Sequence, residues 1–177
     1  MTTLKLAISE SQIQECVGRL AQLIQADYQD QPLLVVGVLR GSFIFLSDLI
    51  RHMDLPVQVD FVRLSSYDAL AKSSGAVRLH HGVRTSVVGK NVLVVEDIVD
   101  TGLTAQFLRE YFEGQGAATV RICSLLDKPV RRRTSVTVDY VGFEVPDQFL
   151  VGYGLDYNQQ YRELRALYSL EAGTDGS

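Results

Sequence analysis

The stretch from Val92 to Ala105, VLVVEDIVDTGLTA, decides the fold of this 177-residue chain. Its aliphatic start leads into two adjacent carboxylates, Glu96 and Asp97, and a third carboxylate, Asp100, follows. A short run that is apolar at every position is typical of a strand buried on both faces of a parallel sheet. The acids therefore emerge at the carboxyl end of a central strand, where open α/β sheets bind their ligands.

The turn after the acids, Thr101-Gly102-Leu103-Thr104, opens a predicted helix. Its backbone N–H groups and two hydroxyls suit an anion such as phosphate. Carboxylates beside such a turn indicate a ligand with both hydroxyls and phosphates, with a divalent cation between them. The triplet from Asp100 to Gly102 also matches aspartic proteases, but that chemistry needs two such aspartates sharing a proton.

Strands and helices alternate along the chain, which predicts an α/β fold with a mainly parallel central sheet flanked by helices. No linker or repeat is visible, so residues 1–177 are expected to form one domain, with a small lobe built from the chain ends. Further strands are predicted at 33–39, 57–64, 118–126, 139–143 and 149–153, a polar loop at 65–75, a hairpin at 77–88 and a disordered tail at about 171–177. A first helix, capped by Ser9 or Ser11, has apolar positions from 13 to 24 and ends before the turn at 30–32, and further helices are predicted at 43–52 and 106–113.

Composition narrows the class of protein. A hydrophobic content of 46% and a charged content of 21% are ordinary for a globular protein, and the net charge of -4 argues against a nucleic-acid surface. Cys16 and Cys123 match no disulfide or zinc spacing, which indicates a reducing compartment. The start of the chain shows no signal peptide and no apolar run is long enough to span a bilayer. We therefore expect a cytoplasmic protein without a membrane or nucleic-acid partner.

Two candidate sites in other parts of the chain each have an ordinary structural interpretation as well. Leu39-Arg40-Gly41-Ser42 follows an apolar strand, so its glycine permits close approach to a ligand and Ser42 can cap the next helix. Arg40 can serve an anion or be solvated. Lys128, just past a predicted strand, can donate to a carbonyl oxygen or be solvated, and the basic run 131–133 is interpreted as a solvated face.

The segment from Phe149 to Tyr157 is dense in aromatic residues and glycines. Its rings can stack on a heterocycle or fill a core. Asp156 can reach a metal ion or simply form a turn.

Together these motifs resemble, in the same order, those of the type I phosphoribosyltransferases, and within that family the enzymes that act on hypoxanthine and guanine. The resemblance runs from about Leu33 to Leu167. It is carried by LRGSF (39–43), SSY (65–67), VEDIVDTGLT (95–104), LLDK (125–128), VGFEVPDQFLVGYGLDY (141–157) and YR (161–162).

The resemblance implies a type I phosphoribosyltransferase fold with a small hood lobe from the chain ends. It also implies a Mg²⁺-dependent reaction of purine salvage. In that reaction 5-phosphoribosyl 1-diphosphate and hypoxanthine or guanine give IMP or GMP and pyrophosphate. The expected partners are these small molecules and further copies of the chain in a dimer or tetramer.

The resemblance also assigns a role to each motif. The phosphoribosyl and 5′-phosphate site comprises Glu96, Asp97, Asp100, Thr101, Gly102, Leu103 and Thr104, with Asp100 as the catalytic general base. The pyrophosphate site comprises Leu39, Arg40, Gly41 and Arg162, with a cis peptide expected between Leu39 and Arg40. The purine site comprises Lys128, Phe149, Leu150 and Asp156; the metal ligands are Glu96, Asp97 and Asp156; and Ser66 and Tyr67 begin a mobile lid at about 65–88.

One residue departs from the family pattern, and two other functions fit the same fold. Leu103 stands where relatives often carry a polar residue, so its backbone is expected to act there.

A transcription regulator of this fold would bind the phosphoribosyl ligand, but it would not need Lys128, Phe149 or a catalytic acid. A phosphoribosyltransferase directed to xanthine or pyrimidines is the nearer alternative. A competition assay with purine bases separates it from an enzyme of hypoxanthine and guanine.

Overall fold

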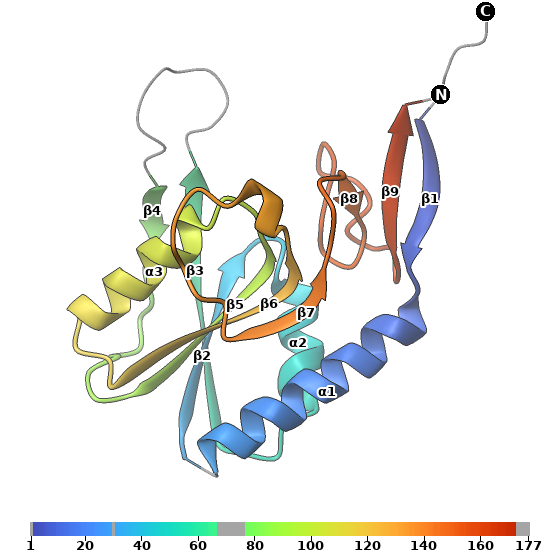
Figure 1. The fold of residues 1–177 in the computed structure, drawn as a ribbon. Coiled ribbons are helices and arrows are strands. Elements are labelled where there is room, and N and C mark those ends of the chain that lie inside the picture. The colour runs from blue at the N-terminus through green and yellow to red at the C-terminus, as the bar shows by residue number, and fades with distance from the viewer. Residues whose placement is uncertain (1, 30, 67–76, 173–177) are drawn as a thin grey trace, which may run out of the picture.

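The computed structural model describes residues 2–29, 31–66 and 77–172 (Figure 1). The elements follow in the order β1 (Thr2–Ile8), α1 (Glu10–Tyr28), β2 (Leu33–Leu39), α2 (Phe43–Arg51), β3 (Val57–Ser66), β4 (Val77–His81), β5 (Asn91–Val99), α3 (Leu103–Gly114), β6 (Thr119–Asp127), the 3₁₀ turn η1 (Pro129–Arg131), β7 (Tyr140–Glu144), β8 (Leu150–Val151) and β9 (Leu167–Ala172). None of the helices in these ranges is long and apolar enough to cross a bilayer.

A six-stranded sheet in the order β4-β3-β2-β5-β6-β7 forms the body of the molecule. Every neighbouring pair from β3 to β7 is parallel, and only β4 runs antiparallel, beside β3. Helices α1 and α2 cover one face and α3 covers the other (Figure 1). The mainly parallel α/β sheet expected from the sequence is confirmed.

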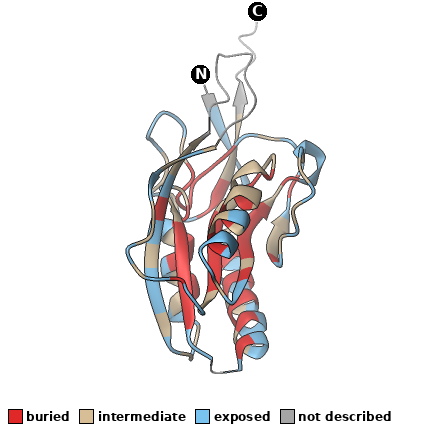
Figure 2. Ribbon diagram, turned by 90° about the vertical axis from the view of Figure 1, so that its left-hand side faces the viewer, coloured by how far each residue is buried: buried red, intermediate tan, exposed pale blue. Residues whose placement is uncertain are grey.

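Two apolar cores lie on the two faces of this sheet. Because successive side chains of a strand point to opposite faces, Val35 and Val95 pack with α1 and α2. Val36 and Val94 pack with α3 on the other side. Figure 2 shows the result, with buried residues through the central strands and on the inner sides of the helices. Burial on both faces explains the unbroken apolar runs 33–36 of β2 and 92–95 of β5.

A serine holds the N-cap position of each of the helices α1 and α2. Ser9 caps α1, where its hydroxyl accepts from the Gln12 backbone N–H and the Gln12 side chain accepts from the Ser9 backbone. Ser42 holds the N-cap position of α2, but its hydroxyl donates to the Val38 carbonyl oxygen at 2.8 Å. The expected side-chain cap at Ser42 is therefore wrong, because the hydroxyl closes the preceding loop instead.

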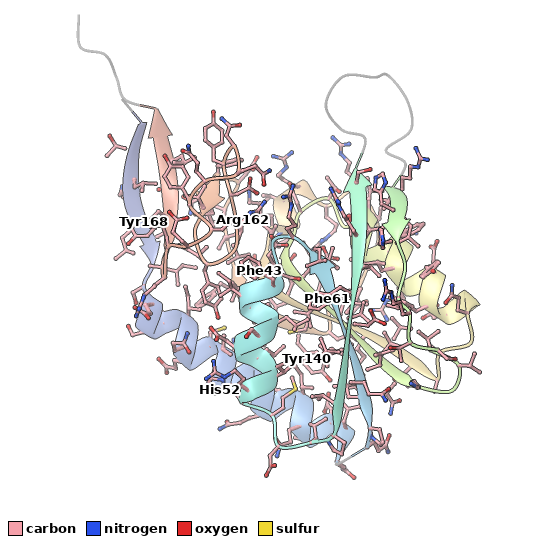
Figure 3. All side chains as sticks on the ribbon, turned by 180° about the vertical axis from the view of Figure 1, so that it is seen from behind. Phe43, His52, Phe61, Tyr140, Arg162 and Tyr168 are labelled. Atoms are coloured by element: carbon pink, nitrogen blue, oxygen red, sulfur yellow. The ribbon has the colours of Figure 1, made fainter. Side chains whose placement is uncertain are left out.

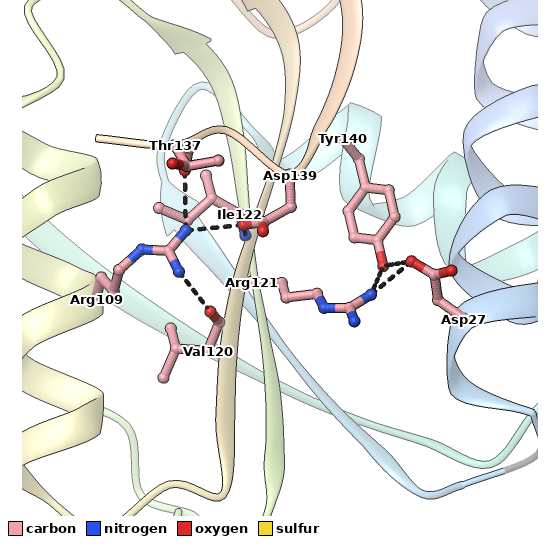
Figure 4. A network of polar contacts seen from close by, with 8 residues as sticks. All are labelled: Asp27, Arg109, Val120, Arg121, Ile122, Thr137, Asp139 and Tyr140. Carbon is pink, nitrogen blue, oxygen red and sulfur yellow. Dashed lines mark hydrogen bonds and ion pairs between the residues drawn. The ribbon is translucent and has the colours of Figure 1, made fainter. Parts of the chain in front are cut away.

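Polar contacts fasten helices to the β6–β7 edge of the sheet (Figure 4). Arg109 of α3 pairs with Asp139 at 2.8 Å and also donates to two backbone carbonyl oxygens. Arg121 of β6 pairs with Asp27 of α1 at 2.5 Å and donates to the Tyr140 hydroxyl of β7 at 2.6 Å. These contacts fix the strands whose carboxyl ends carry the site described below.

A second, three-stranded antiparallel sheet, β1-β9-β8, is built from the two ends of the described chain. It forms a hood beside the carboxyl edge of the main sheet (Figure 1). The predicted lobe is confirmed, although β1 and β9 themselves had not been predicted as strands. Strand β8 spans only Leu150–Val151, shorter than the predicted 149–153, because Gly152, Tyr153 and Gly154 adopt positive φ.

Other predicted elements and boundaries also differ from the structure. The hairpin expected at 77–88 is wrong, since β4 pairs with β3 and the Asp60 carboxylate then accepts the backbone N–H groups of Arg84 and Thr85. Helix α3 begins at Leu103, three residues before its predicted start. Strand β9 continues through Ala172 into the predicted tail, of which 173–177 lie outside the described residues.

Candidate functional site

The acidic strand end and the turn after it surround a pocket at the carboxyl edge of the main sheet. The pocket has a volume of about 130 Å³ and is lined by Glu96 and by every residue from Ile98 to Ala105. Gly102 caps α3 with φ of 83° and has no side chain to cap the helix, and the Leu103 N–H makes only a long contact of 3.5 Å with the Thr101 hydroxyl. A Cβ at this glycine would lie 2.8 Å from atoms of Arg132 and Val136. The turn therefore needs glycine and presents backbone donors to an anion.

Glu96 is buried, with only 5% of its surface exposed. Its Oε1 atom has no hydrogen-bond partner among the described residues. Burial and then the negative charge of Asp97 raise the pKa of Glu96 to about 8, while the Arg132 guanidinium opposes the shift. A buried carboxylate without a partner is costly, which indicates that a ligand or cation completes this position.

Asp97 lies against the loop between β2 and α2. A Cβ on Gly41 would fall 1.7 Å from the Asp97 carboxylate, so only glycine fits there. Burial raises the pKa of Asp97 to about 6; backbone N–H groups and the Arg162 guanidinium lower it, and the Asp156 carboxylate raises it. These interactions bring the predicted sugar, pyrophosphate and metal residues to one place.

The loop of the LRGSF motif contains a cis peptide bond and packs against the backbone of the hood. The peptide bond between Leu39 and Arg40 is cis, as the resemblance implied. A Cβ on Gly154, whose φ is 101°, would lie 2.2 Å from the Gly41 carbonyl oxygen. Gly41 is thus enclosed between the carboxylate of Asp97 and the backbone of the hood, and both contacts depend on the lack of a side chain.

Arg162 ties the hood segment together beside this loop (Figure 3). Its guanidinium donates to the Gly154 carbonyl oxygen at 2.6 Å and pairs with Asp156 at 2.6 Å. The other carboxylate oxygen of Asp156 accepts the Gln159 backbone N–H at 2.9 Å. Asp156 therefore forms a turn, as one of its two interpretations predicted, and its charge also acts on Asp97; its role toward a metal ion stays a prediction.

Lys128 follows β6, and only 6% of its surface is exposed. Its backbone N–H donates to the Val99 carbonyl oxygen at 3.0 Å, which sets the lysine beside the end of β5. The Lys128 ammonium lies 3.8 Å from the Asp147 carboxylate. The alternative of a solvated lysine is therefore wrong.

An exposed aromatic ring and the edge of a strand lie next to this lysine segment. Phe149 is 53% exposed and meets Tyr157 edge to face with ring centroids 5.6 Å apart. Leu150 is buried, and its strand β8 is the edge strand of the hood sheet. An exposed ring offers a stacking surface and an edge strand offers free backbone donors and acceptors.

Two arginines and two aspartates that were not predicted as site residues also lie at the site. Arg131 pairs with Asp100 at 2.9 Å and with Asp147 at 3.3 Å. Arg132 pairs with Asp127 and donates to the Asp100 carbonyl oxygen at 3.5 Å. The prediction that this basic run is a solvated face is wrong for these two arginines. Their position, directly after a strand that ends in a buried lysine, is the signal that could have revealed them.

The expected lid is only partly described. Ser66 ends β3, and Tyr67 lies outside the described residues. Where the expected lid joins the sheet, the side chains of Ser65 on β3 and His80 on β4 share a hydrogen bond of 2.6 Å.

Within the described residues, no group of three or more His, Cys, Asp or Glu side chains gathers closely enough to hold a metal ion by itself. Glu96 and Asp97 on β5 and Asp156 in the hood nevertheless all border the same edge. Any cation there needs additional oxygen ligands.

Known proteins resemble this chain over most of its length. The model of the phosphoribosyl transferase domain matches residues 9–158. The hypoxanthine-guanine phosphoribosyltransferase of Bacillus subtilis is 46% identical over 160 residues, which cover 90% of this chain and 89% of that protein. A crystal structure of a hypoxanthine-guanine phosphoribosyltransferase from Bacillus anthracis superposes with a TM-score of 0.91 at 42% identity, covering 97% of this chain and all of that one.

A further solved structure concerns the role of the C-terminal region in the oligomeric state and enzymatic activity of the Trypanosoma cruzi hypoxanthine phosphoribosyl transferase. It has a TM-score of 0.89 and 38% identity, and it covers 94% of this chain and 91% of that one. With the match of the domain model, these likenesses show that the chain belongs to the phosphoribosyltransferase family, and that its fold is the type I fold of these enzymes.

Proposed function

We propose that the protein transfers the 5-phosphoribosyl group of 5-phosphoribosyl 1-diphosphate to hypoxanthine or guanine, giving IMP or GMP and pyrophosphate in purine salvage. The observation that carries this proposal is the buried Lys128, whose backbone is bonded to Val99 at the end of β5. Its ammonium lies 3.8 Å from the carboxylate of Asp147, two residues before the exposed ring of Phe149. A fixed donor beside a stacking surface suits a planar base with a carbonyl oxygen. The names of the relatives support the same substrates.

The sugar and its phosphate would occupy the pocket that follows β5. The backbone N–H groups of Thr101–Thr104 at the start of α3 would bind the 5′-phosphate, with the hydroxyls of Thr101 and Thr104 as further donors. Leu103 would contribute through its backbone. Glu96 and Asp97 would face the ribose hydroxyls, which would supply the partner that the buried Glu96 Oε1 atom lacks.

The pyrophosphate would lie on the loop Leu39-Arg40-Gly41, with Arg162 as the nearby cation. Because a glycine is required at 41, the backbone can approach the ligand closely. Arg162 is already held by Gly154 and Asp156, so it would stabilise the negative charge of the leaving group without a large rearrangement.

The base would stack on Phe149 and meet the backbone of Leu150 along its edge. Lys128 would donate a hydrogen bond to the 6-oxo group. Adenine carries an amino donor at that position, so the lysine would face another donor and adenine would be rejected.

Asp100 would act as the general base. As the bond between C1′ and the pyrophosphate oxygen breaks with its electron pair, purine N9 forms the new bond to C1′, and the Asp100 carboxylate takes the proton from N7. Asp100 stands next to the phosphate-binding turn and is half-buried, which suits this role. The segment of about 65–88 would act as a lid that keeps water from the activated sugar.

The residues also fit a divalent cation, which the family implies. Glu96 keeps an unpartnered buried oxygen, and Asp97 and Asp156 are hard oxygen donors that repel one another electrostatically. We propose Mg²⁺, held by these three carboxylates through water and completed by ligand oxygens. When bound, it would neutralise negative charge on the pyrophosphate.

We further propose that the protein is a homo-oligomer, a dimer or tetramer, located in the cytoplasm. Exposed apolar side chains gather on α2 and the neighbouring strand β3, where Phe43, Val59 and Phe61 are each more than a third exposed (Figure 3). Such a patch is typical of a protein interface. The charged phosphoribosyl substrate does not cross membranes unaided, which favours the compartment where it is made.

A spectrophotometric assay with Mg²⁺, 5-phosphoribosyl 1-diphosphate and each of hypoxanthine, guanine, xanthine and adenine tests the function. Turnover of hypoxanthine or guanine with adenine inert is expected, and Lys128→Gln should raise the KM for the base far more than Lys90→Gln, an exposed control. Fastest turnover of xanthine would contradict the proposed base preference. Binding of the phosphoribosyl ligand without turnover of any base would favour a regulator.

A further inference from the structure

Asp147 occupies the turn between β7 and the base-stacking residue Phe149. The Val145 backbone N–H just before it donates to the Asp127 carbonyl oxygen at 2.8 Å, and the Gln148 N–H just after it donates to the Pro146 carbonyl oxygen at 2.8 Å. The backbone of this turn is therefore fixed to the end of β6. A side chain at 147 is held at a defined place relative to Lys128, which follows the same strand.

The carboxylate of Asp147 contacts two cations with the same oxygen. Its Oδ1 atom lies 3.8 Å from the Lys128 ammonium and 3.3 Å from the Arg131 guanidinium. Arg131 also pairs with Asp100. The charges alternate in the order Lys128, Asp147, Arg131, Asp100, so that the group proposed to recognise the base and the proposed general base belong to one chain of ion pairs.

Among the described residues, Asp147 is the only carboxylate within ion-pair distance of the Lys128 ammonium. A charged side chain that is almost entirely buried needs an opposite charge nearby to offset the cost of its burial. The separation of 3.8 Å is longer than a hydrogen bond, so the carboxylate attracts the ammonium without occupying its donors. Those donors remain free for a carbonyl oxygen of a ligand.

We propose that Asp147 is a positioning residue that holds Lys128 in place for the 6-oxo group and thereby sets the preference for 6-oxopurines over 6-aminopurines. This inference rests on the proposed function. Asp147 would act through Lys128 and need not touch the base. Arg131, held in turn by Asp100, would keep the Asp147 carboxylate in this place.

The first test compares Asp147→Asn with the wild type in steady-state assays. The KM for hypoxanthine should rise roughly fivefold, equivalent to about 1 kcal/mol, while the KM for 5-phosphoribosyl 1-diphosphate changes less than about twofold. The ratio of hypoxanthine to adenine turnover should fall. Asp147→Glu, which keeps the charge, should recover most of the wild-type KM. Glu144→Gln removes an exposed carboxylate from the same segment and should change none of these values.

The second test asks whether Asp147 acts through the lysine. The dissociation constant of GMP, which requires no turnover, is measured for wild type, Asp147→Asn, Lys128→Gln and the double variant. If Asp147 acts through Lys128, Asp147→Asn weakens GMP binding in the wild type and has no further effect in Lys128→Gln. An equal loss in both backgrounds would overturn the inference, because it would indicate a merely structural role of the turn.

Failure of the inference and failure of the proposed function give different results. If the wild type turns over hypoxanthine or guanine and Asp147→Asn has the same KM and base selectivity, only the positioning role is overturned. If the wild type turns over no 6-oxopurine, the proposed function itself falls, and the inference falls with it.

Discussion

Replacing Glu96 with glutamine should stabilise the ligand-free protein, and the gain should grow as the pH rises. Burial raises the pKa of Glu96 from 4.5 to about 8, so the folded protein holds this proton more tightly than the unfolded chain. The wild type therefore loses stability as the pH rises through the window between these two values, by about 1.4 kcal/mol per pH unit. Glutamine is neutral throughout and does not share this loss.

The expected magnitude follows from that slope. Between about pH 5.5 and about pH 7.5 the advantage of Glu96→Gln over the wild type should increase by roughly 3 kcal/mol. Asp97 titrates in both proteins, so most of its contribution cancels. Urea unfolding in buffers with a chelator measures the free energy of unfolding at each pH, and Glu144→Gln serves as an exposed control. The same difference between wild type and Glu96→Gln at both pH values would refute this reasoning.

Three other substitutions test the geometry of the site. Gly154→Ala should lower the free energy of unfolding by more than about 2 kcal/mol, because φ is positive at this residue and the new Cβ would meet the Gly41 carbonyl oxygen. Thermal unfolding should then show a Tm roughly 5–10 °C lower than that of the wild type. An unchanged Tm would contradict the close contact. Gly41→Ala should displace the Asp97 carboxylate and raise the KM for 5-phosphoribosyl 1-diphosphate roughly tenfold in steady-state assays, with little change in Tm. An unaltered KM would count against a site that Gly41 and Asp97 share. Asp100→Asn should lower kcat by about 10²-fold or more while ligand dissociation constants change only a few-fold, and wild-type turnover would exclude the general-base role.

The central part of the fold could be predicted because its signals are local. The strands β2 and β5 contain the apolar runs 33–36 and 92–95. Glu96 and Asp97 come next within β5, and Asp100 and the Thr-Gly turn follow the strand directly, so order along the chain also gives order in space. The cap at Ser9 is likewise a local pattern. Residues such as Glu96 and Thr101 were therefore placed correctly in one pocket.

Features that depend on distant partners could not be predicted in this way. β1 and β9 pair with each other across almost the whole chain, so neither has a partner nearby in sequence. The roles of Arg131 and Arg132 depend on Asp100, Asp127 and Asp147, which lie on other segments. A run of three arginines looks the same in sequence whether it is solvated or paired, because composition does not record which charges meet in space.

The two sheets assign the two halves of the ligand to separate parts of the molecule. The turn proposed for the phosphate extends from β5 in the six-stranded sheet, whereas Leu150, proposed to meet the base, belongs to β8 in the hood. Among the described strands, β8 pairs with β9 alone, and β9 in turn pairs with β1. Substitutions in β8 are therefore expected to alter the contact with the edge of the base while the turn proposed for the phosphate, on the other sheet, keeps its own backbone support.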